Sequence, residues 1–182
     1  MAASVGPYSL GNNPPGEIIS FGGALYVATS TGAIFAYSLN PDGSLTAVAG
    51  SPFAAGTGLS QLAALVSFAD GNTAFLYGAN TADANGSISA FGIGPSGGLT
   101  PVAGSPFPTV AGSGPAGFYA GKFLYVALKN SNSVAAFKIA DDGSLTSLRY
   151  ARYAFTSEAS SDRAATEDPE VGTRALWPVS VP

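Results

Sequence analysis

One short motif returns three times along the chain, and this repeat limits the folds that the sequence can adopt. The motif contains Leu-Tyr and occupies residues 25–28, 76–79 and 124–127, so consecutive copies lie about 50 residues apart. Each copy is followed by an alternating apolar run and then by a Gly-x-Leu-Thr segment. These segments start at Gly43, Gly97 and Gly143. Self-similarity at a period of 20 to 50 residues is typical of solenoids, propellers and arrays. The pattern predicts a repeat architecture but names no reaction.

Within each copy, turn residues separate four short apolar segments, and several of these alternate at the period of two that is typical of β-strands. No helical periodicity is present. We expect strands at 17–21, 24–29, 33–39 and 44–49, at 62–68, 74–80, 87–93 and 99–103, and at 117–120, 123–128, 133–139 and 144–148. Four-stranded units of this length are typical of propeller blades. The predicted fold class is therefore all-β: a partial β-propeller of about three four-stranded antiparallel blades.

The repeats also predict how the blades are joined. The units run near 17–53, 62–107 and 117–148, within a blade region of residues 1–148. Gly-Ser-Pro-Phe connectors stand at 50–53 and 104–107, and their proline ends an outer strand because it has no N–H to donate. We expect the phenylalanine to fill the wedge between adjacent blades. Three tyrosines at one blade position are expected in the core: Tyr26, Tyr77 and Tyr125.

The composition excludes several kinds of chemistry. Apolar residues make up 46% of the chain, which is enough for a substantial core, and the chain has neither histidine nor cysteine. Ser-His-Asp and Cys-His catalysis, disulfides and thiolate metal sites are therefore impossible within it. The net charge is −4 and the first basic residue is Lys122, so nucleic-acid binding is not expected. No apolar run reaches the length of a membrane helix. The first residues lack an export signal, which leaves the localisation open.

The last 34 residues differ from the rest in composition. Residues 149–182 hold nine of the 18 charged residues and only one short apolar-rich run, at 150–155. Such segments bury too little apolar surface to compensate for the entropy of folding. We expect this tail to be irregular, either disordered or weakly packed.

Together, these motifs resemble the lactonase-type seven-bladed β-propellers, the family of 6-phosphogluconolactonase and the fungal carboxy-muconate cyclase. The family blade reads approximately Leu-Tyr-Val-Ala-Asn, Val-x-x-Phe and then Gly-x-Leu-Thr-x-Val-x-Gly-Ser-Pro-Phe. Residues 75–80, 88–91 and 97–107 match this pattern closely, and the resemblance covers about residues 6–148. It implies a propeller of about seven blades, of which this sequence contains three.

The departures from the family pattern are informative. The family asparagine is kept only as Asn80, and Thr29 and Leu128 replace it in the other copies. The sequence enters on a connector-like Gly-Pro-Tyr at 6–8, and no third Gly-Ser-Pro-Phe follows residue 148. We therefore expect a fragment of a longer propeller, from a truncated or frameshifted gene.

The candidate site lies where the loops before the inner strand and after the second strand converge on the channel of a propeller. These loops contain Glu17, Gln61, Asp83, Asn85, Lys129, Asn130 and Asn132. A lactonase needs a group that activates water and a partner for the developing oxyanion. Glu17 or Asp83 is the candidate base and Lys129 the candidate electrostatic partner. The alternative is that all three are ordinary solvated loop residues.

No cofactor or metal site is expected. Asp42 and Asp142 stand in Asp-Gly-Ser turns, with Asp141 directly before the second turn. Turn formation is sufficient to explain these residues, and a Ca²⁺ site would require six or more oxygen ligands.

Two classes of function stay open. The resemblance implies hydrolysis of a sugar or carboxylic lactone, which would be the small-molecule partner. The scarcity of ionisable side chains favours a non-catalytic propeller that acts as a binding or interaction scaffold. Whether the chain is an enzyme is therefore not decided. Three blades would leave two open blade faces, and exposed apolar faces promote association, so we also expect a homo-oligomer.

Overall fold

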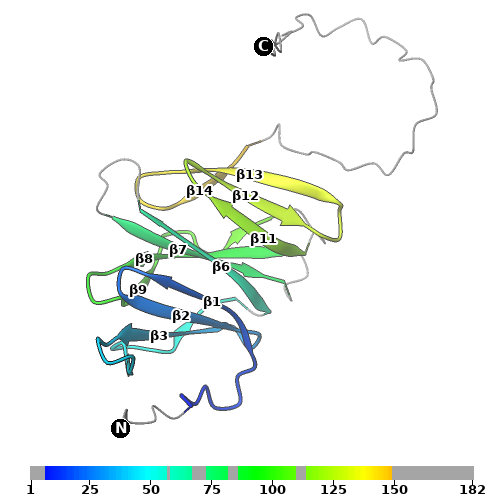
Figure 1. Ribbon diagram of the computed structural model, residues 1–182. Coiled ribbons are helices and arrows are strands. Elements are labelled where there is room, and N and C mark those ends of the chain that lie inside the picture. The colour runs from blue at the N-terminus through cyan, green and yellow to red at the C-terminus, as the bar shows by residue number, and fades with distance from the viewer. Residues whose placement is uncertain (1–6, 57, 67–72, 82–85, 110–113, 149–182) are drawn as a thin grey trace, which may run out of the picture.

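The computed structural model describes residues 7–56, 58–66, 73–81, 86–109 and 114–148. Over these ranges the chain forms β-strands, turns and connectors, and no helix long and apolar enough to cross a membrane was found in them. The strands make three antiparallel sheets, which pack face to face along the chain as three successive blades (Figure 1). The predicted all-β, three-bladed architecture is confirmed.

The first two blades have the same plan. The strands of the first blade are β1 (Pro15–Phe21), β2 (Ala24–Thr29), β3 (Ala33–Leu39), β4 (Leu45–Ala47) and β5 (Phe53–Ala54). Those of the second are β6 (Leu59–Val66), β7 (Ala74–Asn80), β8 (Ser87–Ile93), β9 (Leu99–Pro101) and β10 (Phe107–Pro108). Four strands follow one another from the inner to the outer edge, and the two-residue β5 and β10 pair with β3 and β8.

The third blade has four strands within the described residues. They are β11 (Pro115–Ala120), β12 (Phe123–Leu128), β13 (Ser133–Ile139) and β14 (Leu145–Ser147). Sheet order follows chain order, β11-β12-β13-β14. The predicted tail at 149–182 and the predicted turn at 70–71 lie outside the described residues.

The second and third strands of every blade have the predicted bounds, whereas the inner and outer strands differ from them. The inner strands begin two or three residues earlier than predicted, and in two blades the first residue is a proline, which strands tolerate at that position. The outer strands are shorter than predicted, and in the first two blades a serine hydroxyl of the connector accepts an N–H of the third strand. Ser51 Oγ accepts from Ala36 N at 2.9 Å, and Ser105 Oγ accepts from Ala90 N at 2.8 Å.

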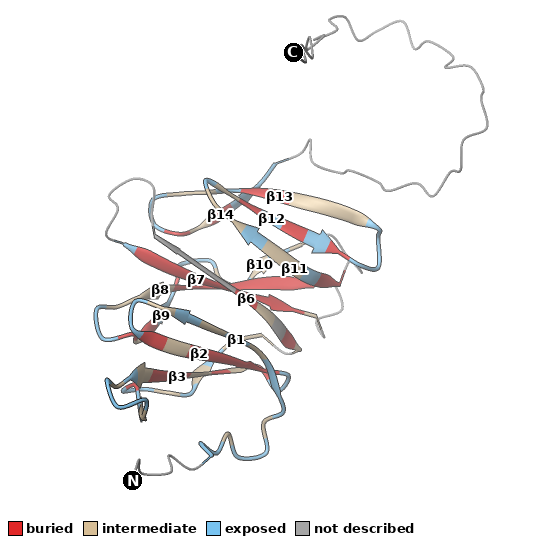
Figure 2. Ribbon diagram, in the orientation of Figure 1, coloured by how far each residue is buried: buried red, intermediate tan, exposed pale blue. Residues whose placement is uncertain are grey.

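Two apolar cores lie between the blades. The first contains Tyr26 and Leu76, and the second contains Tyr77 and Leu124. Strand β7 contributes to both cores, so it is buried along its whole length (Figure 2). Strand β12 instead alternates between buried and more exposed residues, because within the described residues only one of its faces meets another blade. The connector aromatics Phe53 and Phe107 pack against these two cores, as the wedge prediction requires.

Candidate functional site at the loop end of the blades

One end of each blade is held by the same backbone hydrogen bond. The residue after the second strand donates to the residue before the inner strand: Ser30 N to Pro14 O at 3.1 Å, Thr81 N to Gly58 O at 3.0 Å and Lys129 N to Gly114 O at 3.1 Å. These bonds place the start of the inner strand beside the loop that joins the second and third strands. We call this edge of the three blades the loop end.

Glu17 lies at the loop end on an irregularity of the inner strand. The register of β1 against β2 shifts between Pro15 and Ile18, and β6 and β11 carry similar shifts near their starts. In the second and third blades, regular pairing resumes at Gln61 and Gly117, which occupy equivalent positions of their inner strands. β-Bulges of this kind re-aim side chains. Here the half-buried Glu17 carboxylate reaches the next blade, where its Oε2 accepts from Leu62 N.

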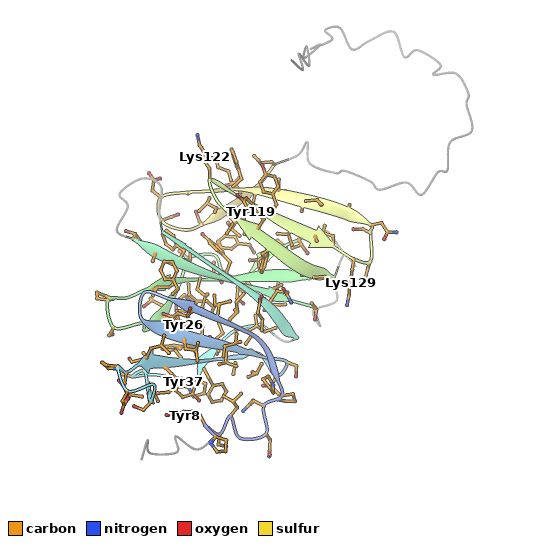
Figure 3. The ribbon with its side chains drawn as sticks, in the orientation of Figure 1. Tyr8, Tyr26, Tyr37, Tyr119, Lys122 and Lys129 are labelled. Carbon is orange, nitrogen blue, oxygen red and sulfur yellow. The ribbon has the colours of Figure 1, made fainter. Side chains whose placement is uncertain are left out.

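The other charged candidate at the loop end is Lys129, directly after β12. Its side chain is exposed, and Figure 3 shows it at the opposite end of the third blade from Lys122. Across the described ranges, no ion pair or hydrogen bond joins Lys129 to Glu17. The two groups stand on the third and first blades, so the structure supplies no direct acid–base pair. Asp83 and Asn85, the remaining candidates on the second blade, lie outside the described residues.

Two loop asparagines of the third blade have local roles. A Cβ at Gly114 would lie 2.7 Å from Asn130 Nδ2, so the asparagine side chain fills the space beside that glycine. Asn132 has a φ of 46°, a left-handed conformation in which asparagine is enriched. Both residues shape the loop between β12 and β13.

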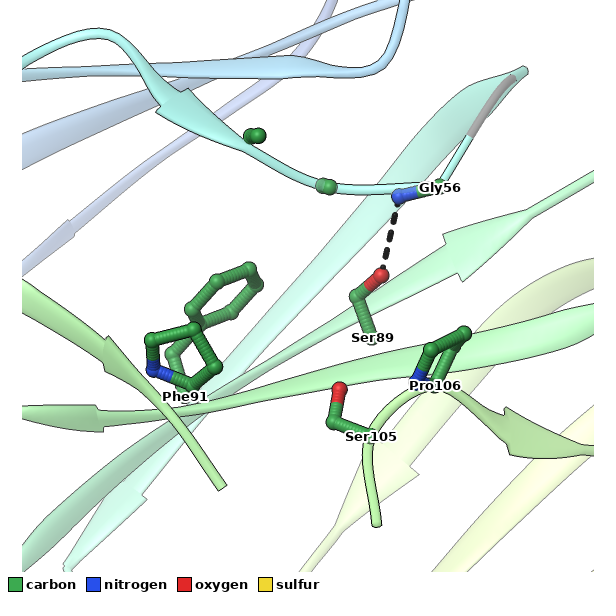
Figure 4. Close-up of a pocket in the computed structure, with 8 residues that line it drawn as sticks. Gly56, Ser89, Phe91, Ser105 and Pro106 are labelled. Atoms are coloured by element: carbon green, nitrogen blue, oxygen red, sulfur yellow. Dashed lines mark hydrogen bonds between the residues drawn. The ribbon is translucent and has the colours of Figure 1, made fainter. Parts of the chain in front are cut away.

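The sequence did not predict the buried polar cluster that surrounds Asn80. With its amide oriented to satisfy its neighbours, Asn80 donates to Gly56 O at 3.1 Å and accepts from Ser89 Oγ at 3.0 Å and Ser87 Oγ at 2.9 Å. Gly56 N in turn donates to Ser89 Oγ at 3.0 Å (Figure 4). A Cβ at Gly56 would meet the Asn80 side chain at 2.4 Å, so only glycine fits. The cluster fastens the connector to the second blade.

A hollow beside this cluster is shown in Figure 4. It has a volume of about 240 Å³ and is lined by Ala54, Ala55, Gly56, Ser89, Phe91, Pro101, Ser105 and Pro106. None of these side chains is charged. Both serine hydroxyls already accept a backbone N–H, from Gly56 and Ala90 respectively. The hollow therefore presents no acid or base of its own.

The repeated tyrosines link one blade to the next. Tyr26 OH donates to Gly97 O at 3.0 Å, and Tyr77 OH donates to Gly143 O at 2.9 Å. Burial raises the pKa of both hydroxyls, and the nearby Asp142 carboxylate raises that of Tyr77 further. The core prediction holds for these two tyrosines. It is wrong for Tyr125, which is 39% exposed because no described blade covers it.

The turn aspartates have the predicted turn role. Asp42 accepts from Ser44 N at 2.9 Å, and Asp142 accepts from Ser144 N at 2.9 Å. Hydrogen bonds from these serines hold the pKa of both carboxyls below the ordinary value. In the described ranges, no three acidic side chains gather into a group that could hold a metal ion.

The comparison with family models decides the family. The model of the lactonase, 7-bladed beta-propeller family matches residues 24–166, which is most of the chain. The chain belongs to this lactonase propeller family. The three blades with their loop end are thus blades of a lactonase-type propeller. A comparison with curated proteins gave no match.

Two solved structures have the same fold. One is a protein from Lactobacillus plantarum, with 25% identity and a TM-score of 0.55. The match covers 76% of this chain and 41% of the Lactobacillus chain. The other is the periplasmic gluconolactonase PpgL of Pseudomonas aeruginosa, with 21% identity and a TM-score of 0.55. The match covers 76% of this chain and 39% of the PpgL chain. The chain thus spans about two fifths of the length of these relatives.

Proposed function

We propose that the loop end of this lactonase-family chain binds a sugar or carboxylic lactone and hydrolyses its ester bond. Family membership is the observation that carries this proposal, and the gluconolactonase among the structural neighbours supports the substrate class. The lactone group itself is neutral and its oxygens accept hydrogen bonds, so the loop-end hydrogen-bonding groups suit it.

In the proposed reaction, Glu17 is the base. The Leu62 amide binds Oε2 and fixes the carboxylate, and Oε1 accepts a proton from the attacking water. The hydroxide equivalent adds to the lactone carbonyl, and Lys129 stabilises the oxyanion that forms. The ring C–O bond then breaks, and the proton passes from Glu17 to the leaving alkoxide. The product is an open hydroxy acid.

The test is acid release from a panel of sugar lactones and carboxylic lactones by the purified protein, against a buffer blank. Glu17→Gln is the informative variant because glutamine keeps an acceptor for the Leu62 amide, and the equivalent position of the second blade is already a glutamine, Gln61. Its control is Asp141→Asn, on an exposed turn. Lys129→Ala is matched by Lys122→Ala, at the other end of the same blade.

We expect Glu17→Gln and Lys129→Ala to lower the rate about 10²-fold or more, as the loss of a general base or an oxyanion partner does, with both controls unchanged. Equal rates in all variants would remove these residues from the mechanism. No rate above the blank in a folded sample would remove the enzyme proposal.

The second candidate function is a non-catalytic binding scaffold. One observation favours it: Glu17 is engaged by a backbone amide, and Lys129 stands two blades away from it. The same lactone panel distinguishes the two, because a scaffold would show ligand-induced stabilisation against heat without acid release.

A further inference from the structure

Within the described residues the third blade is the last of the stack, and its outer face is apolar. Leu124 and Val126 of β12 point into the core shared with the second blade, so the alternate side chains of this strand point away from it. The aromatic rings on that outer face form a cluster. Tyr119 and Tyr125 have ring centroids 6.3 Å apart, and Phe123 and Tyr125 have centroids 6.4 Å apart. Tyr119 is 70% exposed, and a shallow hollow lies between it and Val134.

The first blade lies at the other end of the described stack, and its outer face also exposes apolar side chains. Ile18 and Leu39 are 57% and 45% exposed. Their counterparts by strand register in the second blade are Leu62, which is buried, and Ile93, which packs against the core shared with the first blade. The first blade thus presents the residue positions that, one blade later, are buried by a preceding blade.

The tyrosine–glycine links give these two faces a direction. Each link runs from a tyrosine of one blade to the Gly-x-Leu-Thr turn of the next. A Cβ at Gly97 or Gly143 would collide with the preceding blade, whereas a Cβ at Gly43 would meet nothing within 4 Å. Among the described residues, Tyr125 is thus a donor without its glycine turn, and the Gly43 turn is an acceptor without its tyrosine.

We propose that two copies of this chain associate head to tail, with the third blade of one copy packed on the first blade of the other. Tyr125 OH of one copy then donates to the Gly43 carbonyl of the second copy, as Tyr26 and Tyr77 do within the chain. Such a contact is heterologous, because it joins two different faces.

The charges of the two end blades are complementary. In the described ranges the first blade carries Glu17 and Asp42 and no basic side chain, whereas the third carries all three lysines of the chain. The net charge is therefore negative on the first blade and positive on the third, which also has Asp141 and Asp142. Complementary charge favours the pairing of unlike ends over the pairing of like ends.

The described N-terminal segment covers part of the first-blade face. The ring of Tyr8 lies 5.8 Å from that of Tyr37 (Figure 3), and Leu45 N donates to its hydroxyl at 2.7 Å. Tyr8 therefore places a phenol beside the turn that Tyr125 of a second copy would reach. It is 38% exposed, and it must leave these two contacts before Tyr125 of a second copy can reach the turn.

The test is the mass in solution by sedimentation velocity over a dilution series of the full chain. Leu39→Glu places a charge on the first-blade face only, and Ala127→Glu does so on the third-blade face only. Both positions are exposed, so neither change alters a core. Thr100→Glu, on the exposed outer strand of the middle blade, is the matched control. Tyr125→Phe removes only the proposed hydrogen bond.

We expect the wild type and Thr100→Glu to form dimers or larger species, and each of the two face variants to be monomeric. An equimolar mixture of the two face variants should regain a dimer, because each keeps the face that the other lacks. Tyr125→Phe should weaken the association about fivefold, the worth of one hydrogen bond, and Tyr8→Ala should strengthen it.

Three results would overturn the proposal: a wild-type monomer at every concentration, a Leu39→Glu variant that still dimerises, or a mixture of the face variants that stays monomeric. The second would reveal an isologous contact between third blades. None of these readouts depends on lactone hydrolysis, so the association and the proposed activity fail separately.

Discussion

Replacing one repeated tyrosine with phenylalanine tests whether the blades are held together as the structure indicates. Tyr77→Phe removes the hydroxyl that donates to Gly143 O at 2.9 Å in a buried environment. A hydrogen bond contributes about 1 kcal/mol net, and a buried acceptor left without a donor costs about 1–3 kcal/mol. We therefore expect the free energy of unfolding to fall by about 1–3 kcal/mol. At a urea slope of about 2 kcal/mol/M, the midpoint falls by about 0.5–1.5 M.

The chain contains its own control for this substitution. Tyr26→Phe removes an equivalent bond, to Gly97 O at 3.0 Å, and should cost about as much. Tyr125→Phe is the same chemical change at the same blade position, but the side chain is 39% exposed. At protein concentrations low enough to keep the chain monomeric, it should change stability by less than about 0.5 kcal/mol.

Alkaline pH gives a second readout of the same bond. The pKa of the Tyr77 hydroxyl is raised in the folded chain, so its contribution to stability is complete below the ordinary tyrosine value of about 10. This contribution is lost as the pH rises through the folded value. Tyr77→Phe should therefore unfold less steeply with rising pH than the wild type.

Two results would refute this reasoning about the tyrosine links. One is a Tyr125→Phe variant that loses as much stability as Tyr77→Phe in urea unfolding followed by circular dichroism. The other is a Tyr77→Phe variant with wild-type stability, which would mean that the interblade bond contributes nothing net.

Three further predictions concern single contacts. Gly97→Ala should lower the unfolding midpoint more than Gly43→Ala. Both glycines have φ near +80°, but a Cβ at Gly97 would lie 2.9 Å from a side-chain atom of the first blade, whereas a Cβ at Gly43 would meet no atom within 4 Å. Equal midpoints would contradict this packing. Asn80→Ala should cost about 1–3 kcal/mol, since it leaves buried polar groups without partners; a change below 0.5 kcal/mol in urea would show that the cluster does not hold the connector. The pKa values of Asp42 and Asp142 are lowered, so both stabilise the fold above pH about 3.9 and cease to do so as the pH falls through their folded values. Replacing both with asparagine should flatten the acid dependence of the midpoint, and an unchanged dependence would contradict the assignment.

The middle strands of the blades could be predicted to the residue because local chemistry bounds them. Strand β3, for example, begins after Gly32 and ends before Asn40, and the residues between them largely alternate between more and less buried positions. The two-residue strand β5 could not be predicted, since it follows a proline and exists only because the connector folds back onto β3. Local sequence carries no signal for a pairing this short.

The position of the candidate site was more predictable than its contacts. The topology of a blade alone puts Glu17 and Lys129 at one end, since both adjoin the loop before the inner strand or after the second. The bond from Leu62 N to Glu17 depends on how closely two blades pack. The role of Asn80 likewise depends on where the connector glycine Gly56 arrives. Contacts between elements so far apart in sequence have no periodic pattern that would reveal them.

The direction of the tyrosine–glycine links bears on how such chains can change in length. Every blade of about fifty residues carries one phenol for its successor and one glycine turn for its predecessor. A gene duplication that copies one blade therefore adds a donor and an acceptor together, and a deletion removes both. The hydrogen bond itself then needs no new partner, although the packing around it differs between blades, since Gly97 lies against Ala24 and Gly143 against Phe75. The bond that joins the blades is thus inherited together with each blade.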